Sequence, residues 1–232
     1  MKALLVVLVL LLGLLGLAFV ADRVAVRFAE DRVAEQLAVK GNLHGTPKVQ
    51  IEGFPFLTQA VRGRYDDVHI SLTAAELGQP EGTEADVALR GVHVPLSDVL
   101  SGSVATVPVD RVDGTATLSY ALLAAELGGD TRLRREGDGL RITRTVEVAG
   151  LTLPLTAAGT VSLDGNEVVI DVARASGAGV DVPAFLVQRI SNLLDLRYKI
   201  PSLPFGLEVT GVTVGDDGLD VTVEGKGIVL GG

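Results

Sequence analysis

Thr160-Val161-Ser162-Leu163-Asp164-Gly165-Asn166-Glu167-Val168-Val169-Ile170 is the stretch that decides the fold of this 232-residue chain. Two runs rich in β-branched and apolar residues flank the turn signal Asp164-Gly165-Asn166. A short Asp-Gly connection between two such runs is typical of a β-hairpin. The stretch therefore predicts two antiparallel strands that are neighbours in a sheet.

The same pattern continues on both sides of this hairpin. Further turn signals stand at Gly137-Asp138-Gly139 and Asp216-Asp217-Gly218. Strands are predicted at Lys48 to Gly53, Arg64 to Leu72, Asp86 to Leu96, Arg111 to Leu118, Thr131 to Glu136, Leu140 to Leu163, Glu167 to Ala175, Leu207 to Val214 and Leu219 to Leu230. Consecutive hairpins form a meander, so we expect an α+β protein with a long twisted antiparallel sheet wrapped around few helices.

Three helices are predicted. Apolar residues at helical spacing indicate an amphipathic helix from Ala21 to Val39, which Gly41 ends. Ser119 is placed to cap a helix from Tyr120 to Leu127. Pro183 occupies a first-turn position for a helix from Ala184 to Leu194, which is apolar around much of its circumference.

The N-terminus carries a membrane signal. Met1-Lys2 precedes an unbroken apolar run from Ala3 to Val20, which is about 27 Å long as a helix and just spans a bilayer core. Residues 1–21 are therefore a signal anchor or a signal peptide. Gly16-Leu17-Ala18 is a poor cleavage site, which favours a retained anchor. The rest of the chain is then extracytoplasmic, either anchored at the outer face of the plasma membrane or secreted to the periplasm or cell wall space.

Residues 22–232 are expected to form a single domain. Within it the segments 63–97 and 114–156 share an order of motifs: a strand begins at a glycine, an Ala-Ala-Glu-Leu-Gly sequence follows, and then comes a Pro-Leu pair. Both duplication and chance explain this similarity in a chain rich in Ala, Leu and Gly.

Composition excludes several classes of function. The chain has no cysteine, hence no disulfide and no thiolate metal site. A formal net charge of −9 and a pI of about 4.8 argue against nucleic-acid binding. No hydrolase, metalloprotease, Walker or dinucleotide motif occurs, so we expect no enzymatic activity, no cofactor and no metal.

The charged residues of the predicted strands have ordinary explanations. His69 and His93 alternate with apolar neighbours and are predicted to be solvated. Five arginines flank the Gly137-Asp138-Gly139 turn, and they form either a solvated hairpin face or a phosphate-binding group. They are Arg132, Arg134, Arg135, Arg141 and Arg144.

Two proline-containing segments place bulky apolar residues at strand boundaries. Gly53-Phe54-Pro55-Phe56-Leu57-Thr58-Gln59-Ala60-Val61-Arg62-Gly63 holds two of the six phenylalanines of the chain, and Leu203-Pro204-Phe205-Gly206 holds another. Proline removes a backbone donor and fixes φ, so each segment ends a strand and carries apolar side chains into a loop or opening.

These segments, the N-terminal anchor followed at once by a helix, and Asp217-Gly218-Leu219 in the last hairpin resemble the LmeA-like phospholipid-binding family of actinobacterial cell envelopes. The similarity covers nearly the whole chain. It implies a tubular lipid-binding-like fold, in which a twisted sheet wraps a helix to form an apolar tunnel. It also implies binding of phospholipid, of phosphoinositide type in particular, and a role in the elongation of mannan-bearing lipoglycans or in envelope maintenance.

We hypothesise a lipid-contacting set that ordinary core packing would explain equally well: Phe54, Phe56, Leu57, Phe185, Leu186, Ile190, Leu193, Leu194 and Phe205. Arg62 and Arg64 are the candidates for contact with a headgroup. The predicted function is non-enzymatic binding or transfer of phospholipid. The alternatives are an envelope scaffold that recruits a glycosyltransferase without a lipid cavity, and an enzyme of lipid-linked glycans whose carboxylate or histidine cluster distant strands would bring together.

Overall fold

The computed structural model describes residues 2–101, 104–127, 130–148, 151–165, 167–177, 180–181, 196–199 and 206–231. The chain divides into two compact units. Unit 1 comprises Met1–Ser71, Val87–Val112 and Lys226–Gly232, and unit 2 comprises Leu72–Asp86 and Asp113–Gly225. The predicted boundary between a leader and a single domain at residue 22, and the duplication, stay predictions.

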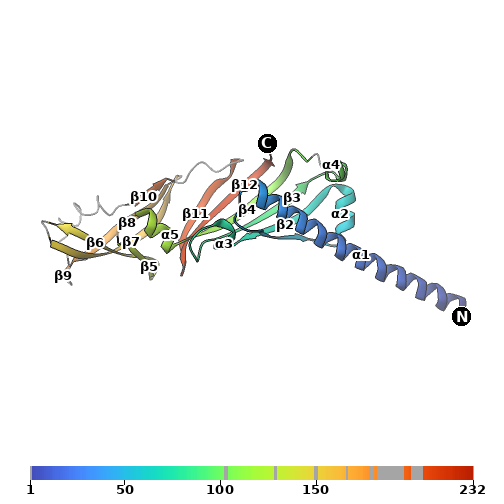
Figure 1. Ribbon diagram of the computed structural model, residues 1–232, viewed down its shortest axis with the longest axis horizontal. Coiled ribbons are helices and arrows are strands. Elements are labelled where there is room, and N and C mark those ends of the chain that lie inside the picture. The colour runs from blue at the N-terminus through green and yellow to red at the C-terminus, as the bar shows by residue number, and fades with distance from the viewer. Residues whose placement is uncertain are drawn as a thin grey trace. The chain divides into compact units, whose positions relative to one another are not determined.

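The fold is α+β, as predicted, with its strands in two sheets rather than one (Figure 1). The first sheet has the order β1 (Lys48–Glu52), β2 (Arg64–Leu72), β3 (Glu84–His93), β4 (Val107–Ser119), β12 (Gly218–Leu230) and β11 (Glu208–Val214). The second has the order β10 (Leu196–Lys199), β8 (Glu167–Gly177), β7 (Leu151–Asp164), β6 (Gly139–Val148) and β5 (Arg132–Glu136), and β9 (Val180–Asp181) pairs with β8.

The hairpin predicted at the Asp164-Gly165 turn is confirmed. Strands β7 and β8 pair antiparallel, with Asp164 opposite Glu167, and Gly165 takes a φ of +61°. The long apolar stretch from Leu140 to Leu163 is not one strand, because the chain folds back between Val148 and Leu151 and β6 pairs with β7. A single strand of that length would extend for roughly 80 Å, far beyond the usual length of a strand.

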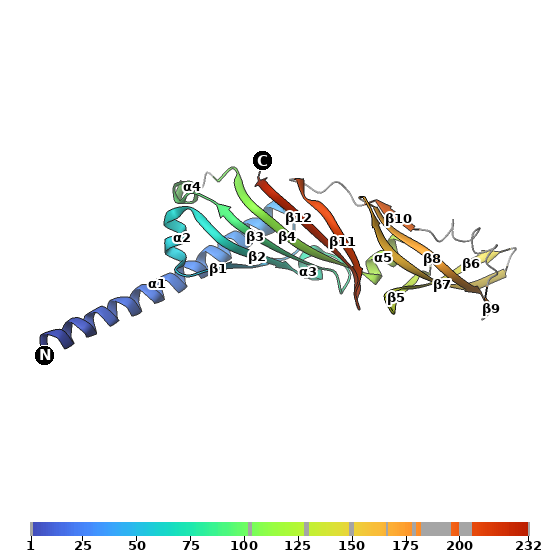
Figure 2. The ribbon, with the colours of Figure 1, turned by 180° about the vertical axis from the view of Figure 1, so that it is seen from behind.

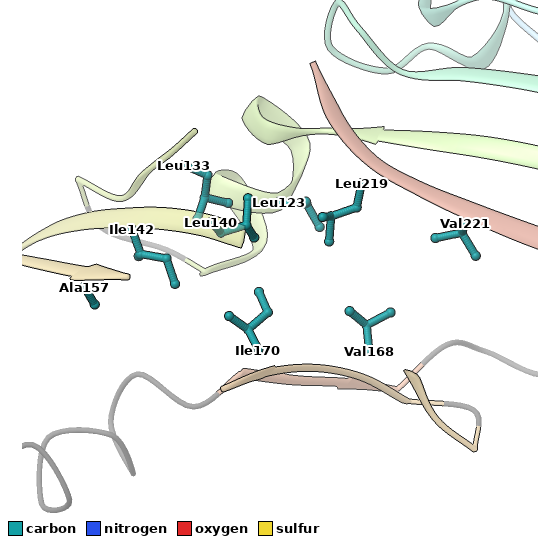
Figure 3. Packing of buried hydrophobic residues seen from close by; sticks show 9 residues of the cluster. All are labelled: Leu123, Leu133, Leu140, Ile142, Ala157, Val168, Ile170, Leu219 and Val221. Atoms are coloured by element: carbon teal, nitrogen blue, oxygen red, sulfur yellow. The ribbon is translucent and has the colours of Figure 1, made fainter. Parts of the chain in front are cut away.

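Unit 2 has a core of aliphatic side chains from α5, β5 to β8 and β12, shown from close by in Figure 3. Leu140 is fully buried, and Leu219 and Ile170 are only 1% and 2% exposed. The cluster comprises Leu123, Leu133, Leu140, Ile142, Ala157, Val168, Ile170, Leu219 and Val221. Because these residues come from two sheets and a helix, the cluster holds together the elements of unit 2.

The described helices are α1 (Lys2–Lys40), α2 (Phe56–Arg62), α3 (Ala74–Leu77), α4 (Leu96–Ser101) and α5 (Tyr120–Leu127). Helix α5 begins where predicted, and the amide of Leu122 donates a 3.2 Å hydrogen bond to Ser119 Oγ. The helix predicted from Ala184 to Leu194 lies outside the described residues. Helices α2, α3 and α4 were not predicted, because each is shorter than the window over which helical periodicity is detected.

Helix α3 nevertheless carries a local start signal. Thr73 and Glu76 form a capping box, the reciprocal pair of side-chain to backbone bonds at a helix N-terminus. The hydroxyl and the amide of Thr73 both donate to the Glu76 carboxylate and lower its pKa. The spacing Thr-x-x-Glu was thus present in the sequence as a signal for this helix.

Replacing Thr73 with alanine is expected to destabilise α3 by about 1 kcal/mol, because the N3 amide loses its side-chain acceptor and Glu76 loses one of its two donors. Thr73→Ser keeps the hydroxyl and is the matched control, with little change expected. Hydrogen exchange of the Leu77 and Gly78 amides measures the difference. Equal exchange in the two variants would contradict a capping role for the hydroxyl.

Candidate functional site

The segment from Gly53 to Gly63 folds as a short helix between two glycines that adopt positive φ. Gly53 has a φ of +96°, Phe54-Pro55 is a cis peptide, and α2 then runs from Phe56 to Arg62. Gly63 ends the helix in the left-handed region, with its N–H directed to the carbonyls of Ala60 and Gln59. The proline and the glycines thus mark a helix rather than an open loop.

The N-terminus of α2 is held by a carboxylate from another helix. Its N-cap residue, Pro55, makes no side-chain capping bond. Instead the amide of Leu57 donates to Asp22 Oδ1 of α1 at 2.8 Å, and Arg23 Nη2 donates to Asp22 Oδ2 at 2.7 Å. Asp22, 35 residues before Leu57 in the sequence, therefore provides the capping acceptor that the Pro55 side chain lacks.

The Asp22 side chain is buried, and its carboxylate accepts hydrogen bonds from Arg23 and from the Leu57 amide. Burial by itself raises the pKa of a carboxyl group. Here the hydrogen bonds from Arg23 and from the Leu57 and Phe56 amides outweigh burial, and the pKa of Asp22 is lowered. The residue is thus ionised at neutral pH. Sequence reasoning missed it because its partner is distant in the chain.

Phe56 belongs to the core of unit 1. It is 5% exposed and packs with Val26 of α1 and Ala60 of α2. The ring of Tyr65 lies 5.9 Å from it, and burial raises the pKa of this tyrosine. Phe56 thus attaches α2 to α1 and to the start of β2. Its role in lipid contact remains a prediction.

Phe54 and Leu57, the two other described members of the predicted lipid-contacting set, lie on the surface with a third apolar side chain. Phe54 is 64% exposed, Leu57 42% and Val61 75%. We call these three residues the α2 surface. The Phe54 ring lies 5.8 Å from the ring of Phe19, near the end of the apolar run, and the Arg23 guanidinium lies 5.4 Å from its centroid. The surface therefore adjoins the apolar part of α1.

The two headgroup candidates are both exposed. Arg64 Nη2 bonds to Asp110 Oδ2 at 3.1 Å, and Asp110 Oδ1 lies 3.0 Å from His93 Nε2. An exposed ion pair of this kind is worth only about 0–1 kcal/mol, which a phosphate readily replaces. Arg62 forms no ion pair with any residue that the structure describes.

The rest of the predicted lipid-contacting set falls outside the described residues: Phe185, Leu186, Ile190, Leu193, Leu194 and Phe205. The structure therefore brings Phe54 and Leu57 together and turns Phe56 inward. A hollow of about 350 Å³ lies near the end of α1, but Asn42, His44 and Thr46 are part of its lining, so we do not assign an acyl-chain site to it.

Two of the five arginines that flank the Gly137-Asp138-Gly139 turn, and both strand histidines, have acidic partners among the described residues. Arg135 binds Asp216 at 2.8 Å, and Arg141 bonds to Glu136. His69 lies 3.2 Å from Asp67. Among the described residues no group of three or more His, Asp or Glu side chains is arranged to hold a metal ion.

The fold and the α2 surface define a β-rich protein that presents apolar side chains beside a long apolar helix. Residues 20–224 match the family model described as LmeA-like phospholipid-binding, and the chain belongs to this family. The resemblance found in the sequence is thereby confirmed. The family is one of phospholipid-binding proteins rather than of enzymes. No curated protein and no solved structure matches the chain.

Proposed function

We propose that this protein binds phospholipid outside the plasma membrane and holds or transfers it without catalysis. The observation that carries the proposal is the exposure of Phe54 and Leu57 directly beside the apolar run of α1, in a chain of a phospholipid-binding family. Apolar side chains that remain exposed next to such a helix are suited to contact acyl chains. An exposed cation, Arg62, lies five residues after Leu57 on the same helix, where it suits a lipid phosphate.

The finer parts of the proposal come from the family resemblance. We propose a phosphoinositide-type lipid as the ligand, and support for lipoglycan elongation or envelope maintenance as the role. We propose the cell envelope as the location of the protein for the same reason. The acidic chain argues against adsorption through charge alone, so apolar contact supplies most of the binding free energy.

We also propose that the N-terminal segment is a retained anchor. Helix α1 is long and apolar enough to cross a membrane by length and composition. Two contacts join it to the segment Phe54–Leu57 close to the poor cleavage site at Ala18: the ring contact of Phe19 with Phe54, and the bond between Asp22 and the Leu57 amide. Cleavage after Ala18 would leave Phe19 and Asp22 in the first turn of a shortened helix, where helix ends fray, whereas both residues lie inside the continuous helix of the uncleaved chain.

Lipid extraction and native mass spectrometry of the purified full-length chain test the proposal. We expect a stoichiometric phospholipid, and its headgroup identifies the class. Uptake of labelled phospholipid from vesicles is the second measurement. A protein that is empty and takes up no lipid would overturn the proposal, and capture of a glycosyltransferase by such an empty protein would favour a scaffold.

Substituting Ile190 with tryptophan separates a lipid-lining role from a core role for the predicted apolar helix. A larger side chain in a lining displaces lipid while the fold remains, whereas overpacking a core costs about 1–3 kcal/mol or more of stability. We expect lipid occupancy to fall while the circular dichroism spectrum is unchanged. Unfolding with no specific loss of lipid would place Ile190 in the core.

A further inference from the structure

We propose that the α2 surface docks into the outer leaflet of the same membrane that the apolar run of α1 crosses. This inference rests on the anchor proposed above. It goes beyond lipid binding, because a carrier needs no fixed position in the bilayer. Figure 2 shows α2 beside the middle of α1, where the helix leaves the strands of unit 1 and its N-terminal part extends alone.

The contacts of α2 with α1 fix its depth. The apolar run ends at Val20, after about 27 Å of helix, which matches the thickness of a bilayer core. Asp22 lies only about 3 Å further along the helix axis, and it bonds to the Leu57 amide. The contact of Phe54 with Phe19 is one turn closer to the membrane centre. The first turn of α2 is therefore held at the edge of the hydrocarbon layer.

Helix α2 buries Phe56, Gln59 and Ala60. Gln59 is 7% exposed, and its amide bonds to the Glu52 carbonyl at 3.0 Å and to the Asp66 amide at 2.9 Å. Leu57 and Val61, four residues apart on another face, are turned outward. The outward face of a helix on a water-facing surface is polar, whereas Leu57 and Val61 make the outward face of α2 largely apolar, so this face is matched to an apolar surrounding.

The charges next to α2 suit a lipid surface. From Gly53 to Arg64 the chain has no acidic residue and two arginines, although its net charge is −9. Arg23 lies beside Phe54 and is paired with Asp22, as Arg64 is with Asp110, so Arg62 is the cation of this segment that has no ion pair with a described residue. Each basic residue near an anionic leaflet is attracted to it, and the apolar side chains enter between the headgroups. These cations and the continuity with the apolar run favour a bilayer over a second copy of the chain.

The absence of tryptophan from the chain makes the proposal directly testable. Leu57→Trp gives the full-length protein a single fluorophore on the α2 surface. Val39→Trp is the control, because Val39 is 82% exposed on α1 and lies roughly 28 Å beyond Val20 along the axis of that helix. Both proteins are reconstituted in vesicles of phosphatidylcholine and phosphatidylglycerol, with and without bromine on the acyl chains.

We expect the emission of Leu57→Trp to shift to shorter wavelength, to be quenched by the brominated lipid and to be protected from aqueous iodide. The emission of Val39→Trp should stay at longer wavelength, be quenched by aqueous iodide and be unaffected by the brominated lipid. Equal iodide quenching in the two proteins would overturn the proposal. A blue shift without bromine quenching would also overturn it, since a protein partner or a second copy would then cover the surface.

Val61→Trp repeats the measurement one turn along α2 in case the change at Leu57 disturbs folding. The outcome is independent of lipid occupancy. Quenching by brominated lipid in a protein that carries no extractable phospholipid would support docking while removing the proposed carrier function. A lipid-loaded protein whose tryptophan remains in water would support the carrier function and overturn docking.

Discussion

Leu140→Ala is expected to destabilise unit 2 by about 2–5 kcal/mol, which is the usual cost of removing a buried leucine side chain. Leu140 is fully buried in the cluster that joins the strands and helix of this unit. Its neighbours come from strands held by backbone pairing, which limits their collapse into the space. The expected loss corresponds to a factor of roughly 30 to several thousand in the unfolding equilibrium.

Hydrogen exchange of the β6 amides against urea concentration, on the full-length chain in detergent micelles, measures this loss. Leu57→Ala makes the same chemical change at a side chain that is 42% exposed, and it should change stability by less than about 1 kcal/mol. If the two variants lost equal stability, Leu140 would not occupy a packed core.

Asp22→Ala is expected to release α2 from α1. It leaves the Leu57 amide and the Arg23 guanidinium without their shared acceptor, at a cost of about 1–3 kcal/mol. Exchange at the Leu57 amide should accelerate by roughly 5- to 150-fold. Asp31→Ala removes an exposed carboxylate from the same helix and should leave that exchange unchanged. Similar effects of the two variants would exclude a specific role for Asp22.

The stabilisation that Asp22 provides also depends on pH and decreases in acid. Because the pKa of Asp22 is lowered in the folded protein, its stabilisation is fully present above the ordinary carboxyl value near 3.9 and is lost as the pH falls through the folded pKa. Asp22→Asn has no charge to lose. The difference in α2 exchange between wild type and this variant should therefore shrink in acid. A constant difference from pH 7 downward would contradict ionisation.

Elements with local signals were predictable from the sequence. The Asp164-Gly165 turn specifies its hairpin through residues that tolerate the turn geometry, and Ser119 begins α5 through its own hydroxyl. The fold-back within Leu140–Leu163 was missed, because apolar alternation continues through both strands. Thr73 is a different case, since its capping box was present in the sequence and was overlooked.

The candidate site was predictable only in part. Phe54, Phe56 and Leu57 are alike in apolar character, and the sequence placed all three against lipid. The position at which α2 begins separates them, since a helix starting at Phe56 turns that ring inward and Leu57 outward. That starting point is set by Asp22, which no local pattern connects to α2. Tertiary contact, rather than composition, therefore decides which of these apolar side chains remain exposed.

The strand order of the first sheet has a consequence for how the protein is made. Strand β12 is the last strand in the sequence, yet it lies inside the sheet between β4 and β11. Strand β4 is synthesised about 100 residues before β12 and cannot pair with it until β12 has been made. Pairing of strands so far apart in the sequence is slow, because the entropy of closing the loop is lost before the strand contacts stabilise the sheet. The sheet therefore closes only after the C-terminal segment has left the ribosome, and until then unpaired edges of β4 and β11 are open to chaperones and to aggregation.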